Sequence, residues 1–174
     1  MKAAHARAVA CRAMALPHLR PPGERVEMPY QGRWLAGILR KPDGVERAPV
    51  VVMAMGLDSA KEEADCYEQP FLARRMATLA FDGPGQGEAE YDFAIRGDYE
   101  VAVAAVVDFV ETRGDLDASR IGLWGVSLGG YYAPRAAAFE PRASACIALG
   151  GPFDWVAAWG HVAGTHPRGV PGAQ

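Results

Sequence analysis

One pentapeptide in the sequence has the residue types and the spacing of a serine nucleophile. Gly125-Val126-Ser127-Leu128-Gly129 follows the pattern GxSxG, in which a strained turn between a strand and a helix exposes the serine hydroxyl. Glycines stand two positions before and after the serine because larger side chains would collide with the neighbouring strand and helix. The pattern alone is a weak signal in a chain with 20 glycines. The alternative is a glycine-rich turn with an incidental serine.

The segments on both sides of the pentapeptide favour the catalytic interpretation. Residues 120–124 form an apolar run that predicts a strand leading into the turn, and residues 128–139 predict a helix leading out of it. A strand, a GxSxG turn and a helix in this order are the setting of a nucleophile elbow. We therefore expect Ser127 to be a catalytic nucleophile that attacks the carbonyl carbon of an ester or a ketone.

Such an attack creates an oxyanion, which two preorganised N–H groups must stabilise. Leu128, the residue after the nucleophile, supplies one of them at the start of the predicted helix. The second is expected from the loop after the third predicted strand. Leu57 is the candidate there, because Gly56 lets the backbone turn the Leu57 N–H inward. The alternative for this loop is a plain turn at the end of a strand.

Two other segments could be mistaken for functional motifs. Residues 82–87 are dense in glycine but lack the GxxxxGKS/T pattern of a phosphate loop, so we expect a rigid loop packed under the active site. Lys61-Glu62-Glu63 is interpreted as the solvated start of a surface helix, with its acidic residues near the N-terminus. No motif indicates a metal or another cofactor, and we expect none.

The rest of the chain predicts the elements that position these residues. An Ala-rich helix over 3–16 is followed by two extended runs, 24–30 and 34–39, that form an antiparallel hairpin. Strands over 49–55, 76–81, 120–124 and 143–149 then alternate with helices over 61–76, 98–112 and 128–139. This alternation predicts an α/β fold with a mostly parallel, doubly wound sheet and helices on both faces. Ligands of such sheets bind at the carboxyl ends of the strands.

The composition of the 174 residues is that of an ordinary globular protein, with 50% hydrophobic and 22% charged residues. A net charge of −3 without a basic run argues against nucleic acid or an anionic membrane as a partner. The apolar runs are too short for a membrane span, and the N-terminus lacks the apolar stretch of a signal peptide, so we expect a cytoplasmic protein. The cysteines lack CxxC spacing and are interpreted as buried or incidental thiols: Cys11, Cys66 and Cys146.

At this point the motifs resemble a known family. The stretch from about residue 20 to 155 is similar to α/β-hydrolases of the esterase type, and within them to the group of 2,6-dihydroxypseudooxynicotine hydrolase and the FrsA-like proteins. The similarity is carried by five blocks in order, residues 56–63, 81–87, 97–100, 125–130 and 140–142. It implies the α/β-hydrolase fold, a Ser127 nucleophile, oxyanion donors at Leu57 and Leu128, and a small-molecule substrate such as an aromatic ketone or ester.

The resemblance also divides the chain. Residues 1–23 are expected to end a longer helical N-terminal or lid region, and residues 24–155 to form a partial α/β-hydrolase core. Residues 156–174 are rich in glycine, proline and small polar residues without pattern, so we expect a frayed tail.

The remainder of the catalytic triad is harder to find. Its order in this fold is serine, acid, histidine. Glu140 ends the helix behind Ser127 and is expected to point away, whereas Asp154 follows the sixth strand, where a minority of these enzymes carry the acid. His161 and His166 follow Asp154 too closely to leave room for another strand and its crossover. We therefore expect a truncated fold that lacks its last strands and the usual histidine.

Three functions remain open. The first is a serine hydrolase of ester or carbon–carbon bonds, inactive or nearly so in this form. The second is a short paralogue that only binds a ligand or a partner, and the third is an unrelated doubly wound binding domain, for which no cofactor motif is present. Without further strands, the strand over 143–149 becomes an exposed apolar edge, so we expect a dimer or an aggregate.

Overall fold

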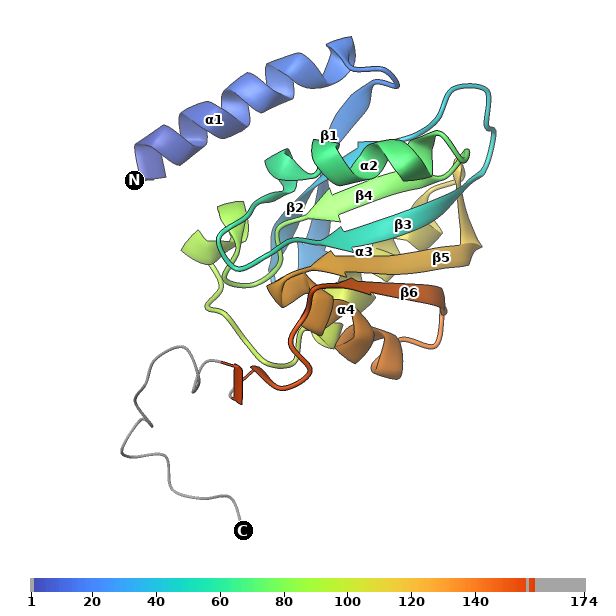
Figure 1. The fold of residues 1–174 in the computed structure, drawn as a ribbon. Helices are drawn as coiled ribbons and strands as arrows, with labels where there is room; N and C mark the ends of the chain where they lie inside the picture. The colour runs from blue at the N-terminus through green and yellow to red at the C-terminus, as the bar shows by residue number, and fades with distance from the viewer. Residues whose placement is uncertain (1, 156, 159–174) are drawn as a thin grey trace.

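The computed structural model describes residues 2–155, 157 and 158 and shows one mixed sheet with helices on both faces (Figure 1). The sheet has six strands in the order β1-β2-β4-β3-β5-β6. Their bounds are β1 Gly23–Tyr30, β2 Arg33–Arg40, β3 Ala48–Ala54, β4 Ala77–Phe81, β5 Leu116–Val126 and β6 Ala143–Leu149. The helices are α1 Lys2–Ala15, α2 Asp65–Leu72, α3 Glu100–Thr112 and α4 Leu128–Phe139, and the 3-10 turns are η1 Leu16–His18, η2 Lys61–Glu63 and η3 Gly87–Tyr91.

The predicted α/β fold is confirmed. Strands β1 and β2 form the antiparallel hairpin, closed by the two residues Gln31 and Gly32, whose φ angles are 46° and 77°. Strands β4, β3, β5 and β6 are parallel to one another, and β2 joins this group antiparallel to β4. The arrowheads of the parallel strands therefore point to one edge of the sheet, where Ser127 follows β5 (Figure 1).

Two apolar layers hold the sheet between the helices. On one face, α3 and α4 pack on side chains of β3 and β5 such as Val50, Val52 and Leu123. On the other face, Tyr67 and Phe71 of α2 pack on a smaller cluster: Val51, Met53, Met55, Ala64, Ala80 and Trp124. Alternate residues of β3 thus enter opposite layers, as expected for a strand buried on both faces.

Helix α2 is shorter than the helix predicted over residues 61–76. Beyond Leu72 the chain turns back, with φ of 64° at Arg75 and a hydrogen bond of 3.1 Å from the Met76 N–H to the Phe71 carbonyl. A left-handed residue just past the last turn is a common helix end, but glycine usually occupies it. An arginine in this position gives no warning in the sequence.

The N-terminal helix α1 is held to the rest of the chain by polar contacts. None of its residues is buried, in agreement with an Ala-rich helix that has no apolar face. Arg12 pairs with Asp65 at the start of α2, and His5 Nδ1 lies 2.9 Å from the Tyr91 hydroxyl. The predicted helix is confirmed, and its contacts connect it to both α2 and η3.

Neither the cysteines nor the described helices are of a kind expected for a disulfide-linked or membrane-spanning chain. Cys11, Cys66 and Cys146 are free and exposed, which fits incidental thiols and not buried ones. In the part of the chain that the structure describes, none of the helices combines the length and the apolar character that crossing a bilayer requires.

The interpretation of Lys61 as part of a solvated helix start is also wrong. Its side chain is only 1% exposed, and its ammonium group lies 2.8 Å from Asp82, 2.8 Å from Glu62 and 2.7 Å from Glu88. Burial alone would lower the pKa of Lys61, but the carboxylates of Asp82, Glu62 and Glu88 together outweigh it and raise that pKa. Lys61 therefore remains charged and joins η2 to the loop after β4.

A second buried ion pair joins β2 to α2. Arg40 is 2% exposed and donates to Glu68 over 2.8 Å and to the Pro21 carbonyl over 2.9 Å, while the Thr78 hydroxyl donates to Glu68 over 3.0 Å. Burial raises the pKa of the Glu68 carboxyl above its ordinary value, although the hydrogen bond from Arg40 lowers it. Loss of Arg40 therefore leaves an unpaired carboxylate in the core.

Strand β6 is an edge of the sheet. Among the described strands it pairs with β5 alone, and its Ile147 and Leu149 side chains are 48% and 47% exposed. An edge strand with apolar side chains and free backbone groups can pair with another chain.

We predict that Arg40→Met lowers the free energy of unfolding by about 3–5 kcal/mol, because Glu68 loses its buried cation. Without Arg40 the pKa of Glu68 rises further, so the folded state binds a proton more tightly than the unfolded state and the deficit shrinks as the pH falls. Urea denaturation at pH 8 and pH 6 measures this. Arg33→Met, which removes an exposed pair with Asp92, serves as the control, with an expected change within about 0.5 kcal/mol. Equal deficits for the two variants would contradict the prediction.

We also predict that the 174-residue chain self-associates through β6. Size-exclusion chromatography with light scattering is expected to give a mass above that of the monomer, and Ile147→Lys to shift it toward the monomer, since lysine on an edge opposes strand pairing. Val101→Lys adds the same charge at an exposed position of α3 and is expected to leave the mass unchanged. A monomeric wild-type chain would rule the association out.

Candidate active site

Ser127 occupies the sharp turn between β5 and α4. Its backbone has φ 55° and ψ −118°, a conformation that side-chain-bearing residues rarely adopt. Its N–H donates to the Leu149 carbonyl of β6 over 2.9 Å, and its carbonyl accepts from Gly130 over 2.9 Å. The serine is thus fixed in the strained turn expected of a nucleophile elbow, at the carboxyl edge of the sheet.

The glycines around Ser127 are required by close backbone contacts. A Cβ atom on Gly125 would lie 1.9 Å from the Gly129 carbonyl oxygen, and one on Gly129 would lie 2.0 Å from the Ala54 carbonyl oxygen of β3. A Cβ on Gly130 would lie 2.8 Å from the Gly151 nitrogen. The collisions with strand and helix predicted from the pentapeptide are therefore confirmed for both of its glycines.

The two candidate oxyanion donors come from neighbouring segments. Leu128 is the first residue of α4, where helix N–H groups have no partner within the helix. Leu57 lies in the loop after β3, and the preceding Gly56 is beside the nucleophile: a Cβ on Gly56 would lie 3.5 Å from Ser127 Cβ and 3.8 Å from Ser127 Oγ. Within the described structure, the N–H groups of Leu57 and Leu128 donate to no protein acceptor.

The loop of residues 82–87 packs against the segment that carries Leu57. Asp82 accepts hydrogen bonds from the Lys61 N–H, the Lys61 ammonium group and the Glu88 N–H, over 2.8 to 2.9 Å. Gln86 donates to the carbonyls of Met55 and Gly56 over 2.8 and 2.9 Å. The loop therefore packs against the segment beside the candidate site, as expected for a structural loop and not a phosphate loop. The contact of Gln86 was missed from the sequence, where glutamine in a glycine-rich loop gives no specific signal.

The acidic residues and histidines considered for the rest of the triad are Asp154, Glu140, His161 and His166. Asp154 is exposed and accepts the Ala157 N–H over 2.9 Å, so its carboxylate caps a helical turn. Glu140 lies past the end of α4 and bonds to Arg142, away from Ser127 as expected. The described part of the chain shows no hydrogen bond to Ser127 Oγ, and its histidines, His5 and His18, lie in α1 and η1. His161 and His166 lie outside the described residues.

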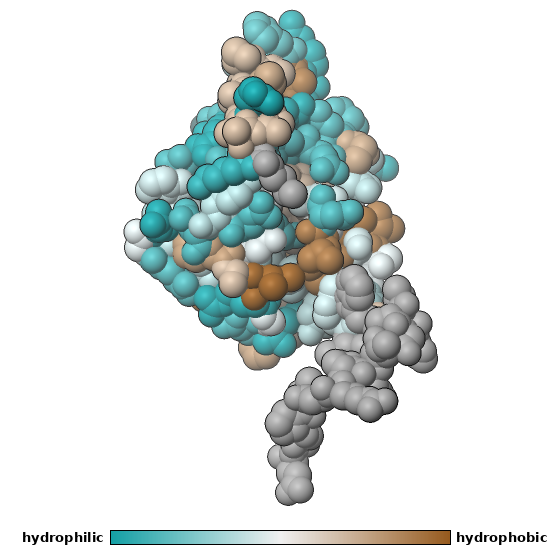
Figure 2. All heavy atoms as spheres, turned by 90° about the vertical axis from the view of Figure 1, so that its left-hand side faces the viewer, coloured by the Kyte–Doolittle hydropathy of each residue, from teal (hydrophilic) through white to brown (hydrophobic). Residues whose placement is uncertain are grey.

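Loops at the carboxyl edge present apolar side chains around the site. Figure 2 looks onto the side of the molecule to which the parallel strands point and shows hydrophobic residues gathered across its middle. Exposed apolar side chains follow three of these strands: Leu57 after β3, Ile95 after β4 and Phe153 after β6. This face can therefore contact an apolar or aromatic group near Ser127.

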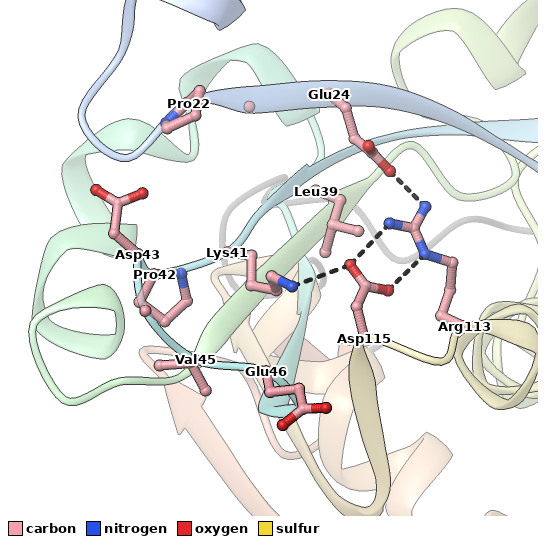
Figure 3. A pocket seen from close by; sticks show the side chains of 12 residues that line it. Pro22, Glu24, Leu39, Lys41, Pro42, Asp43, Val45, Glu46, Arg113 and Asp115 are labelled. Atoms are coloured by element: carbon pink, nitrogen blue, oxygen red, sulfur yellow. Dashed lines mark hydrogen bonds and ion pairs between the residues drawn. The ribbon is translucent and has the colours of Figure 1, made fainter.

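A cavity of about 610 Å³ lies at the end of the sheet opposite to Ser127 (Figure 3). Arg113, just before β5, bridges Asp115 and Glu24 there, and Lys41 reaches Asp115 over 3.4 Å. The hydrogen bond from Arg113 lowers the pKa of Asp115 to about 2. These charges neutralise one another at the amino ends of β3 and β5, away from the edge where parallel sheets bind ligands.

The described residues contain no group of three or more His, Cys, Asp or Glu side chains arranged to hold a metal ion.

Comparison with known proteins places the chain in a family. The model of the FrsA-like esterases matches residues 3–159. The 2,6-dihydropseudooxynicotine hydrolase of Paenarthrobacter nicotinovorans is 45% identical over 146 residues, which are 84% of this chain and 40% of that protein. The 20-hydroxy-prefusarin hydrolase FUS2 of Gibberella moniliformis is 42% identical over 115 residues, 62% of this chain and 27% of that protein.

The fold comparison agrees. The crystal structure of 2,6-dihydroxy-pseudo-oxynicotine hydrolase superposes with a TM-score of 0.83 and 40% identity, covering 93% of this chain and 49% of that one. The chain thus spans less than half the length of the curated relatives that it matches. Since the family model covers nearly the whole chain, the protein belongs to the FrsA-like esterases, a family of α/β-hydrolases.

Proposed function

We propose that Ser127 is the nucleophile of a hydrolase that cleaves an ester bond, or the carbon–carbon bond beside a ketone, in a small molecule. The observation that carries this proposal is the left-handed backbone of Ser127 at the strand-to-helix turn, with φ of 55°. A strained residue of this kind persists only where the surrounding packing enforces it, and such residues cluster at active sites. Membership of a family of esterases and hydrolases supports the same assignment.

The proposed reaction needs one nucleophile and two donors. Ser127 Oγ attacks the substrate carbonyl carbon, and the carbonyl oxygen becomes an oxyanion that accepts from Leu57 and Leu128. Collapse of this intermediate breaks the bond to the leaving alcohol or carbon group, which takes up the proton lost by the serine. Water then attacks the acyl-serine and releases a carboxylic acid. Asp154 remains the candidate acid of the triad.

The substrate class is proposed from the surface around Ser127. The exposed side chains of Leu57, Ile95 and Phe153 suit an aromatic ketone or ester. Three exposed thiols without a disulfide fit a reducing compartment, so we place the protein in the cytoplasm. The exposed edge of β6 favours a second copy of the chain as the partner, which would give a homodimer.

A second candidate function is binding without catalysis. It is favoured by one observation, namely that within the described residues no base reaches Ser127 Oγ. Reactivity of the serine decides between the two, since a binding protein has no need of an oxyanion site.

We predict that excess p-nitrophenyl acetate acylates the chain once, at Ser127. Intact-mass and peptide mass spectrometry are expected to show one acetyl group on the peptide containing Ser127 and none there in Ser127→Ala. Ser144→Ala removes an exposed hydroxyl on β6 and is expected to keep the labelling. Labelling that survives in Ser127→Ala, or is absent from the wild type, would favour the binding function.

We further predict that turnover of this ester by the 174-residue chain is slow. Release of the acyl group requires a base to activate water, and triads without their base retain roughly 10³–10⁴-fold acceleration over water, against more than a millionfold with it. Steady-state release of p-nitrophenolate measures this. Turnover of ~1 s⁻¹ that disappears in Ser127→Ala would show that a complete triad is present.

A further inference from the structure

Gln86 is a buried amide whose hydrogen bonds all go to groups near the proposed oxyanion site. Its residue is 1% exposed, and its NH₂ group donates to two consecutive carbonyls, Met55 over 2.8 Å and Gly56 over 2.9 Å. Its carbonyl oxygen accepts from the Tyr99 hydroxyl over 2.8 Å. Only the nitrogen of a side-chain amide can serve two carbonyls, so these partners fix which way round the amide lies.

The two donated bonds fix the conformation of Gly56. A trans peptide is planar, and its C=O and N–H point in opposite directions. Because Gln86 holds the Gly56 carbonyl, the N–H of Leu57 in the same peptide plane points away from Gln86. The bond to the Met55 carbonyl fixes the preceding plane in the same way. Because glycine has the widest choice of backbone conformations, the two peptide planes beside Gly56 are the ones that depend most on such hydrogen bonds for a fixed orientation.

Tyr99 connects this support to the second donor. Its side chain is fully buried and stacks on Tyr132 of α4, with ring centroids 3.9 Å apart and planes 3° from parallel. A Cβ on Gly83 would lie 2.2 Å from the Tyr99 hydroxyl, so glycine there makes room for it. Helix α4 begins at Leu128, and Tyr99 therefore contacts both the amide that holds the Leu57 loop and the helix that supplies the other N–H.

We infer that Gln86 is a positioning residue, held by Tyr99, that aims the Leu57 N–H at the oxyanion formed on the substrate of Ser127. The inference rests on the proposed function, because it assigns the support of the same site. Gln86 does not touch the substrate and takes no part in proton transfer. Its contribution is to fix a backbone donor before the reaction begins, which is how oxyanion sites lower a barrier.

The test is the rate at which p-nitrophenyl acetate acylates Ser127 in the full chain. The burst of p-nitrophenolate gives the limiting acylation rate at saturating ester and the ester concentration at half that rate. Gln86→Leu keeps the size of the side chain but removes its donors. Its limiting rate is expected to fall about 10- to 100-fold, less than the loss of a whole oxyanion donor, while the half-saturation concentration changes little.

Two further variants separate aiming from simple stability. Tyr99→Phe removes one hydroxyl and is expected to lower the limiting rate about two- to tenfold, the effect of one neutral hydrogen bond. Thr78→Val removes a comparable buried hydrogen bond, which the Thr78 hydroxyl donates to Glu68 of α2. Because this bond does not involve Gln86 or its partners, the variant is expected to leave the rate unchanged. If Gln86→Leu does not fold, Tyr99→Phe against Thr78→Val decides the inference.

A second readout does not depend on catalysis. In ¹⁵N–¹H spectra, the Leu57 amide is expected to give one sharp resonance in the wild type and in Thr78→Val, and a shifted or broadened one in Gln86→Leu. Absence of Ser127 acylation in the wild type would reject the proposed function, and the Leu57 resonance would still test the support by Gln86. A wild-type acylation rate and an unchanged Leu57 resonance in Gln86→Leu would overturn the inference while leaving the Ser127 assignment intact.

Discussion

The candidate site depends on how closely the first turn of α4 approaches the backbone of the sheet. The space around Gly125 and Gly129 admits no Cβ atom, because carbonyl oxygens of α4 and β3 lie within 2.0 Å of where it would be. The turn between strand and helix must therefore be tight, which forces Ser127 into positive φ and lifts its side chain above the edge of the sheet. The same contact brings the first turn of α4, which begins at Leu128, close to the end of β3, since a Cβ on Gly129 would also lie 2.7 Å from the Met55 carbonyl oxygen.

A single short loop supports the other half of the site. Asp82 at its start binds the backbone and the ammonium group of Lys61, and Gln86 near its end binds the carbonyls of Met55 and Gly56. The segment that carries Leu57 is thus fixed at both ends. The glycines of the loop serve these contacts, since a Cβ on Gly87 would lie 2.1 Å from Asp82. A sequence that looks like a phosphate loop is instead a buried scaffold, in which the carboxylate of Asp82 already has partners.

Much of the fold could be predicted because local patterns and burial agree along most of the chain. The strand over 143–149 and the helix over 128–139 were predicted with their observed ends. The hairpin was also predicted, although β2 begins at Arg33, one residue earlier than expected. Strand β5 is longer than predicted because its first part, Leu116–Asp117, pairs with β3 ahead of a register shift, and residues 118–120, which include the polar Ser119 and Arg120, separate this part from the apolar run. Pairing across an irregularity depends on the neighbouring strand and cannot be seen in one segment.

The site was predictable to the extent that it depends on covalent neighbours. Ser127, Gly56 and their glycine contacts follow from steric rules that act within a few residues. Lys61 and Gln86 were misread or missed, since nothing near either residue in the chain indicates burial. Their partners, Asp82 for one and Met55 and Gly56 for the other, lie 21 to 31 residues away. A buried charge or amide acquires its role from the partner that compensates its desolvation, and that partner is known only once the chain has folded.

Stabilisation of an oxyanion and transfer of a proton place different demands on the candidate site. The proposed nucleophile and both proposed N–H donors come from the turn after β5 and the loop after β3. These two strands are adjacent, and the contacts that hold the turn and the loop include residues between 55 and 132 as well as Leu149 of β6. In the proposed reaction, these contacts preorganise the donors that stabilise the oxyanion. Proton transfer is different, because a base acts only at hydrogen-bond distance from Ser127 Oγ and the described residues bring none there. Both acylation and deacylation use the proposed donors to stabilise an oxyanion, and both also need a base, first to take the proton of Ser127 and then to activate water.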